Sequence, residues 1–299
     1  MHPTRLAALA GLLVALAGAL TPATAQQGEK IKVLIIDGQN NHDWKSTTPV
    51  MKKSLEDSGR FVVDVATTPA KSAPPSELKD FKPDLTKYQV ILSNYNGAPW
   101  PEAVQKALET NLSEGKIGLV IVHAANNSFG GWGEYNKMIG MGWRDSKGGD
   151  RLYLDDQGKE VRVPKGTGDG SGHRTTGTWP VVVRDKEHPV TKGMPLEWMH
   201  NQDELYDNMR GPIENIHLLA TAFSKGTKVH EPMIWTIDYG KGRVFHTPMG
   251  HDVNAMKCIG FQTTLNRGTE WAATGKVTLP IPSNFPTADK VSITPAPAK

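Results

Sequence analysis

An unbroken apolar run, KVLIID at residues 32–37, decides the fold that this sequence predicts. The run has the length of a strand and ends at Gly38. A continuous apolar pattern is typical of a strand buried on both faces, as in the parallel sheets of α/β proteins. Three similar runs follow, at residues 61–65, 88–93 and 116–122. Together they predict a mainly parallel central sheet.

Helix signals separate these strands. Thr48 and Pro49 predict a helix with Thr48 as its N-cap and Pro49 as its first residue. Pro101 opens a second helix, which Gly115 closes. Strands that alternate with helices predict βαβ units and an α/β fold. In open parallel sheets the ligand crevice lies at the carboxyl ends of the strands. We therefore expect a site formed by the loops at residues 38–45, 94–100 and 123–133.

The second half of the chain has a weaker pattern. Residues 128–175 are rich in glycine and are expected to be irregular apart from a short helix at Gly133–Ile139. Segments of this length without regular structure are usually lids or disordered, and the sequence assigns no role to the part at residues 144–172. Beyond it we expect strands at 178–184 and 216–222, a hairpin from 232–238 and 242–247, and a helix at 253–273.

The N-terminus has the features of an export signal. Arg5 precedes the apolar run LAALAGLLVALAGAL at residues 6–20, and Ala23-Thr24-Ala25 places small residues before Gln26. This order is that of a secretory signal peptide. The alternative is a membrane anchor, but the run has about 15 residues and a spanning helix needs roughly 20. We expect a periplasmic or secreted protein with a signal peptide at 1–25, one domain at 30–280 and a Pro-rich C-terminal tail at 281–299.

The composition excludes several classes of function. The net charge is only +3 and no basic run occurs, so no nucleic-acid partner is expected. No membrane partner is expected once the signal is removed. Residues 38–41, GQNN, do not match the G-x-G-x-x-G fingerprint, so we expect no nucleotide cofactor. The single cysteine, Cys258, excludes an internal disulfide and lies in a helical apolar pattern typical of the core. The oligomeric state is left open.

Histidines and one carboxylate supply the candidate catalytic groups. His42, His123 and His251 each follow an apolar strand, and Glu204 lies beside an extended segment. Imidazole suits both acid–base chemistry near neutral pH and metal binding. We expect His123, Glu204 and His251 to be catalytic, with His123 and His251 as ligands if a divalent metal is bound. No motif such as H-E-x-x-H occurs, so the sequence permits a metal without requiring one. His246 fits a core role and a functional role equally well.

Polar and aromatic residues in the same loops predict a saccharide as the small-molecule partner. Aromatic faces suit stacking against sugar rings, and Asn, Asp and His bind hydroxyl groups. Four tryptophans fall in loops at or near the crevice, namely Trp44, Trp100, Trp132 and Trp143, and the alternative to stacking is ordinary packing at the rim. Trp132 is expected on a lid formed by residues 128–150. The expected substrate-binding residues are His42, Asp43, Trp44, Asn94, Asn126, Trp132, His173 and Asp203.

Several separated stretches, taken in order, resemble the ThuA-like family, which is named for trehalose utilisation. The resemblance covers residues 32–280. It is carried by Val33–Gly38 with His42-Asp43-Trp44, Gly118–Ala125, His188–Pro195, Asp203–Tyr206, Gly242–His251 and Phe261–Ala273.

This resemblance implies a class I glutamine amidotransferase-like fold, a flavodoxin-like three-layer sandwich, and a role in carbohydrate utilisation. Amidotransferases of this fold carry a nucleophilic cysteine on a sharp turn after a central strand, where this chain has His123-Ala124. A glutaminase activity is therefore not expected. We expect an exported hydrolase, lyase or isomerase acting on a saccharide or keto-sugar derivative. The alternatives are a non-catalytic periplasmic sugar-binding module and, with less support because no Ser or Cys nucleophile is suitably placed, hydrolysis of another amide or ester.

Overall fold

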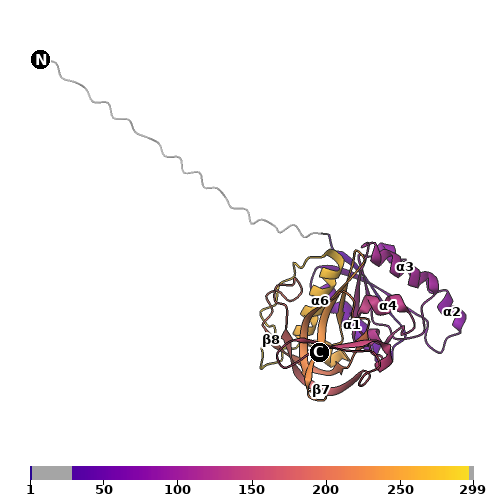
Figure 1. Ribbon diagram of the computed structural model, residues 1–299. Coiled ribbons are helices and arrows are strands. Elements are labelled where there is room, and N and C mark those ends of the chain that lie inside the picture. Colours follow the sequence, from indigo (N-terminus) through magenta and orange to yellow (C-terminus); the bar gives the residue numbers. More distant parts are fainter. Residues whose placement is uncertain (2–28, 296–299) are drawn as a thin grey trace.

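The computed structural model describes Met1 and residues 29–295 (Figure 1). The predicted signal peptide, apart from Met1, lies outside the described residues, as do residues 296–299. Within the described part of the chain, no helix has both the length and the apolar character needed to cross a membrane.

A parallel sheet forms the centre of the fold, as the apolar runs predict. Its strands lie in the order β2-β1-β3-β4-β12, and each is parallel to its neighbours. Their bounds are β1 Ile31–Asp37, β2 Phe61–Thr67, β3 Val90–Ser93, β4 Gly118–Val122 and β12 Gly242–Thr247. The α/β fold class is confirmed.

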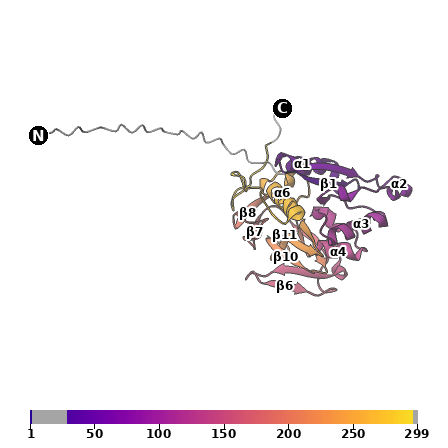
Figure 2. The same ribbon diagram turned by 90° about the horizontal axis from the view of Figure 1, so that it is seen from above.

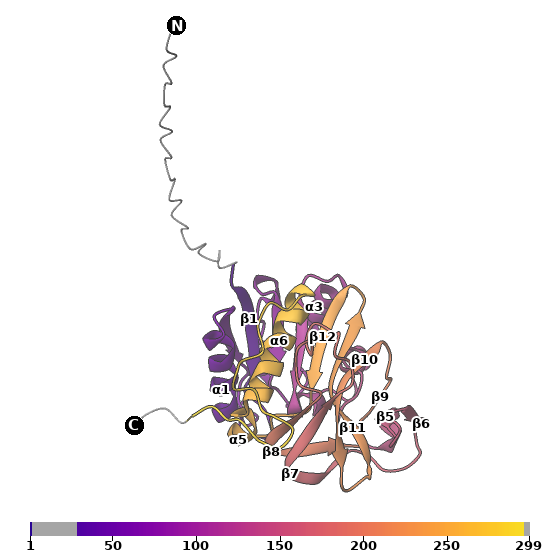
Figure 3. The same ribbon diagram turned by 90° about the vertical axis from the view of Figure 1, so that its left-hand side faces the viewer.

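An antiparallel extension continues the sheet beyond β12, in the order β11-β10-β7-β8 (Figure 3). The bounds are β11 Val229–Tyr239, β10 Ile216–Ser224, β7 Gly172–Val183 and β8 Glu197–Asp207. The predicted hairpin is confirmed, since β11 and β12 pair antiparallel up to Tyr239 and Gly242. A short strand, β5 Asp150–Leu154, branches from β11, and two further strands pair with β5, namely β6 Glu160–Val163 and β9 Arg210–Gly211.

Helices cover both faces of the parallel strands (Figure 2). The side chains of β1 alternate between two cores. Val33 and Ile35 pack with residues of α1 Trp44–Asp57 and α6 Ile259–Thr274. Leu34 and Ile36 pack with residues of α3 Glu102–Ser113 and α4 Gly133–Ile139. The result is the three-layer sandwich that the resemblance implies. The shorter helices are α2 Pro75–Lys79, α5 Val253–Met256 and the 3₁₀ turns Leu85–Lys87, His123–Asn127 and Ser146–Gly148.

Three local predictions are wrong. Helix α1 begins at Trp44, because the Asp43 carboxylate accepts a hydrogen bond from Ser46 N at 3.3 Å and caps it, and Pro49 lies inside the helix. Residues 128–175 are not irregular throughout, because β5, β6 and the start of β7 lie there. These strands are half-exposed and lack an apolar run. The helix expected at 253–273 is two helices, separated at Cys258, whose backbone is extended.

The described part of the C-terminal tail, residues 281–295, lies against the domain. Met199 N donates a hydrogen bond to Thr287 O at 2.8 Å, and Ile259 N donates one to Ser292 O at 2.9 Å. The Phe285 ring contacts Trp198, with 5.5 Å between the ring centres. These contacts tie the tail to β8 and to the start of α6.

Candidate functional site

Four of the predicted residues meet at one point of the sheet edge. His42 follows β1, His123 follows β4, His251 follows β12, and Glu204 projects from β8. One ligand atom from each lies within 4.8 Å of the others. Because the carboxyl ends of parallel strands open onto a single edge, residues far apart in the sequence converge there. We call these residues the four-group cluster.

His123 sits on a strained turn. Its φ of 46° lies in the left-handed region, which costs a side-chain-bearing residue about 1–3 kcal/mol and is retained mostly at functional sites. Its Nδ1 lies 2.7 Å from Pro248 O and donates to that carbonyl. This bond places the lone pair on Nε2, which faces Tyr206 Oη at 3.0 Å and Glu204 Oε2 at 3.8 Å.

The other two histidines also turn a ring nitrogen towards the cluster. The ring centres of His42 and His251 are 4.7 Å apart, and those of His42 and His123 are also 4.7 Å apart. Nδ1 of His251 lies 3.1 Å from Glu204 Oε2, yet it is buried and lacks a partner with hydrogen-bond geometry. A buried nitrogen without a hydrogen-bond partner calls for an explanation, and its closeness to the other three ligand atoms fits a metal ligand.

The protonation states of the cluster also suit metal binding. Burial lowers the pKa of His123 to about 4. Burial and the neighbouring His251 lower the pKa of His42. Burial raises the pKa of Glu204, but the close contact with the His251 imidazole and its charge outweigh burial and lower the pKa overall. Neutral imidazoles and an ionised carboxylate are the donors that divalent transition metals take. The carboxylate of Glu204 raises the pKa of His251, so this imidazole must release its proton when it becomes a ligand. Donor atoms of a tetrahedral Zn²⁺ site lie roughly 3.4 Å apart, so the four groups, which lie within 4.8 Å of one another, must also move closer to share one ion.

Asp203 supports the backbone of the cluster residues. Its buried carboxylate accepts hydrogen bonds from His200 Nε2 at 2.7 Å and Gly250 N at 2.7 Å on Oδ2. Glu204 N at 2.8 Å and His251 N at 3.0 Å donate to Oδ1. Asp203 therefore fixes the backbone of two cluster residues. It was expected to bind substrate, but its acceptor positions are taken by the protein.

An aromatic wall borders the cluster. Tyr206 is two residues after Glu204, so both side chains leave the same face of β8. The Trp143 ring lies 4.7 Å from that of Tyr206 and 5.7 Å from that of His173. His173 is half-exposed, and its Nε2 lies 3.7 Å from Glu204 Oε1. The sequence prediction included His173 and placed Trp143 among the loop tryptophans suited to stacking, but it assigned no role to Tyr206. The i, i+2 spacing from Glu204 could have identified Tyr206.

Asn126 supports this wall. Its Oδ1 accepts a hydrogen bond from Trp143 N at 3.2 Å, and its Nδ2 lies 3.2 Å from Nε2 of His246. Both Asn126 and His246 are completely buried. Burial lowers the pKa of His246 to about 3, so this histidine is a neutral core residue.

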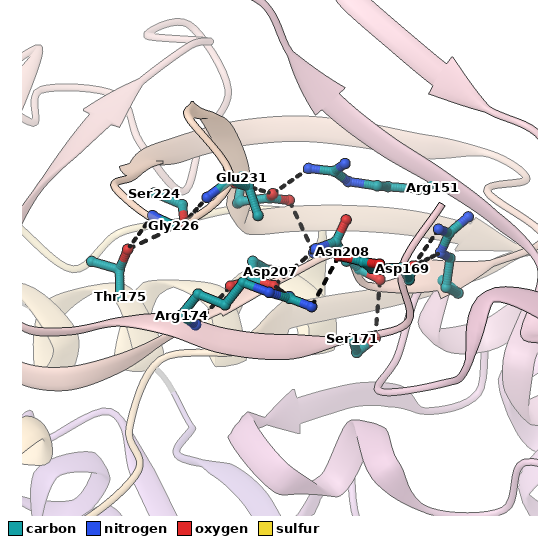
Figure 4. Close-up of polar contacts among 12 residues, drawn as sticks. Arg151, Asp169, Ser171, Arg174, Thr175, Asp207, Asn208, Ser224, Gly226 and Glu231 are labelled. Atoms are coloured by element: carbon teal, nitrogen blue, oxygen red, sulfur yellow. Dashed lines mark hydrogen bonds and ion pairs between the residues drawn. The ribbon is translucent and has the colours of Figure 1, made fainter. Parts of the chain in front are cut away.

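Ion pairs fix β7 against β8 behind the wall (Figure 4). Arg174 pairs with the buried Asp207, whose Oδ2 also accepts from Arg174 N at 2.7 Å. Glu231 is buried, pairs with Arg151 Nη2 at 2.5 Å and accepts from Asn208 N at 3.3 Å. His173 directly precedes Arg174, so this network sets its position opposite Glu204.

The structure places the remaining predicted residues away from the cluster. Trp132 stacks on Tyr135 with 5.4 Å between the ring centres, and its Nε1 donates to Glu109 at 2.7 Å, so it packs against α3 and α4. Asn94 is buried and donates to Thr47 and Thr48 hydroxyls at 3.1 and 3.0 Å. Asp43 caps α1, and Trp44 lines a separate hollow. Cys258 is buried, as expected of a core residue.

Comparison with known proteins gives a consistent result. A family model described as ThuA, trehalose utilisation, matches residues 32–272. The crystal structure of a putative ThuA-like protein from Parabacteroides merdae is 42% identical, with a TM-score of 0.84 over 89% of this chain and 98% of that one. A second such structure, from Bacteroides uniformis, is 21% identical, with a TM-score of 0.54 over 86% of this chain and 97% of that one. No curated protein matches the chain.

Proposed function

The chain belongs to the ThuA (trehalose utilisation) family, and from this premise we propose that it is an exported enzyme of carbohydrate utilisation. It acts on a saccharide or keto-sugar derivative at the four-group cluster. The observation that carries the proposal is the convergence of three imidazoles and one carboxylate at the carboxyl edge of the sheet. Both proton transfer and metal binding need this kind of residue at this spacing.

We propose that His42, His123, His251 and Glu204 bind a divalent transition metal such as Zn²⁺. The ion would polarise a sugar carbonyl or activate a water molecule. The chain's own residues have separate tasks. Glu204 binds the ion through Oε2 and accepts or returns a proton at Oε1, the oxygen that faces His173. Tyr206 donates a hydrogen bond to the sugar oxygen, since its hydroxyl is freed from His123 Nε2 when that atom is a ligand. Trp143 offers an aromatic face to the ring, and His173 binds a hydroxyl at the exposed side.

A glutaminase reaction is not part of the proposal. The strained turn after β4 carries His123 where amidotransferases of this fold have their nucleophilic cysteine. The only cysteine of the chain, Cys258, is buried at the start of α6 and not at this turn. A buried thiol away from the strand ends cannot reach a substrate amide.

Export is proposed from the first 25 residues alone. Their charge, apolar run and Ala-x-Ala site predict cleavage before Gln26 and delivery to the periplasm or medium. Expression of the full chain in a Gram-negative host, followed by N-terminal sequencing of the periplasmic fraction, tests this. An intact N-terminus or a wholly cytoplasmic product would contradict it.

The metal and the reaction are tested together. Purified protein is stripped with chelator, titrated with Zn²⁺ and assayed on neutral disaccharides and their keto derivatives, with chromatography of the products. We expect tight one-to-one binding that His123→Ala and His251→Ala weaken by more than the roughly 10- to 100-fold typical of losing an outer partner. His230→Ala, on β11 and outside the cluster, is the control. Saturable sugar binding without any new product would favour the non-catalytic sugar-binding module instead.

A further inference from the structure

The hollow that Trp44 lines lies beside the four-group cluster. It has a volume of about 300 Å³ and is formed by the loops that follow β1, β2 and β3. The residues that matter are Gln39, Asn41, Trp44, Lys45, Lys71 and Asn96. This volume is at the lower end of the range of roughly 300–1,000 Å³ for small-molecule pockets. It suits one sugar ring and not a large ligand.

The place of this hollow in the sheet favours ligand binding. In the order β2-β1-β3-β4, the direction of strand succession reverses between β1 and β3. Open α/β sheets bind ligands outside the carboxyl ends of strands at this kind of switch point. The loop after β1 contributes residues to both the hollow and the four-group cluster. Asn41 and Trp44 line the hollow, and His42, which lies between them in the sequence, belongs to the cluster.

Gln39 makes the hollow rigid. Its side chain is buried, with Nε2 donating to Pro69 O at 2.8 Å and Oε1 accepting from Ala98 N at 3.0 Å. Its own carbonyl accepts from Asn96 N at 2.8 Å. One residue therefore ties together the loops after all three strands. A pocket that is formed before the ligand arrives loses less free energy on ordering.

The exposed groups of the hollow match a sugar that carries a negative charge. The half-buried Trp44 presents an aromatic face, with Lys45 Nζ 5.7 Å from the ring centre. Asn41 and Asn96 supply amides, bonded to each other at 2.5 Å. No lining residue is acidic, and among the described residues neither Lys45 nor Lys71 has an ion pair. Amides and aromatic faces bind sugar rings, and two unpaired ammonium groups attract a carboxylate.

We propose that this hollow is a second saccharide subsite, one that favours a unit bearing a carboxylate, such as an aldonate or uronate. The inference rests on the proposed function, because it places the reacting sugar at the four-group cluster and the second unit in the hollow. The substrate is then an acidic disaccharide, held across the loop that carries His42.

Binding measurements test the subsite without needing turnover. Zn²⁺-loaded protein is titrated calorimetrically with glucose and galactose as single units, and with three matched pairs: maltose and maltobionate, cellobiose and cellobionate, lactose and lactobionate. For at least one pair, we expect both disaccharides to bind more tightly than the single sugar, glucose or galactose, that they contain. Within that pair, we expect the acid to bind several-fold more tightly than the neutral disaccharide. The advantage of the acid should shrink at high salt.

Variants assign the effect to the hollow. Trp44→Ala should reduce the ratio of disaccharide to single-unit affinity about tenfold, and Trp44→Phe should largely restore it. The double substitution Lys45→Met with Lys71→Met should remove only the advantage of the acid. Affinities that do not distinguish one unit from two, or acids that bind no better than neutral sugars, would overturn the subsite. If the unmodified protein takes up no Zn²⁺, that result counts against the proposed function and not against the subsite. Failure of the subsite and failure of the proposed function are therefore distinguishable.

Discussion

Replacement of Asp203 by Asn should damage both stability and metal binding. The wild-type carboxylate accepts four hydrogen bonds, two on each oxygen. Asparagine keeps one oxygen, which the two backbone donors Glu204 N and His251 N still use. Its amide nitrogen faces Gly250 N, which loses its acceptor, and His200, which loses its charged partner. Hydrogen bonds to a charged group contribute about 1.5–3 kcal/mol each, so the two lost bonds predict a cost of about 3–6 kcal/mol. That is a large part of a typical unfolding free energy of about 5–15 kcal/mol.

Urea denaturation at pH 7 measures this cost, and Zn²⁺ titration of the folded fraction measures the effect on the cluster. We expect affinity to fall roughly 10- to 100-fold, because the backbone of His251 and Glu204 is no longer held. The matched control is Asp252→Asn. Asp252 accepts a hydrogen bond from Ala255 N at 2.9 Å as the cap of α5, and asparagine caps helices equally well. If Asp203→Asn unfolds within about 0.5 kcal/mol of this control, a range typical of neutral surface changes, the reasoning is refuted.

Two further predictions concern stability. Burial opposes the charge on His200, but Asp203 and Cys258 outweigh it and raise its pKa to about 9. The ordinary value is about 6.5, so the stabilisation is complete below pH 6.5 and is lost as the pH rises through 9. The free energy of unfolding of His200→Gln, measured by urea denaturation, should not show this decrease with pH. A wild-type free energy of unfolding that stays constant from pH 7 to 10 would contradict the prediction. A Cβ at Gly268 would lie 2.5 Å from atoms of the Phe245 ring, whereas one at Gly131 meets nothing within 4 Å. We therefore expect Gly268→Ala to cost about 1–3 kcal/mol in the same melts and Gly131→Ala to cost little, and equal effects would show that the core adjusts freely.

The sequence predicts the parallel half of the fold well. The runs that become β1, β3 and β4 are almost continuously apolar because strands covered by helices on both faces must be apolar throughout, whereas the edge strand β2 exposes Val62 and Val65. The antiparallel half was predicted less completely. Strands β5 and β6 are half-exposed and have no such run. Their pairing is decided by contacts made elsewhere in the chain, such as Arg151 with Glu231.

Part of the candidate site was also predictable. His42, His123 and His251 follow apolar strands, and the carboxyl ends of parallel strands share one edge. Local sequence could not separate residues that face the cluster from residues that support it. Asp43, Asn94 and Asp203 have the right chemistry for binding, but their acceptors and donors are used by the backbone or by neighbouring side chains.

By itself, the sequence determined which residue types lie at the ends of the strands, because hydrophobic runs and helix signals are local properties of the chain. Only the tertiary structure decided which of those residues meet. Glu204 reaches His123 and His251 because β8, at the far edge of the antiparallel extension, packs against α5, which follows the loop that carries His251. His123 presents Nε2 because a carbonyl 125 residues away, at Pro248, takes its other nitrogen. Hydrogen-bond partners across such distances depend on packing, and no local pattern encodes them.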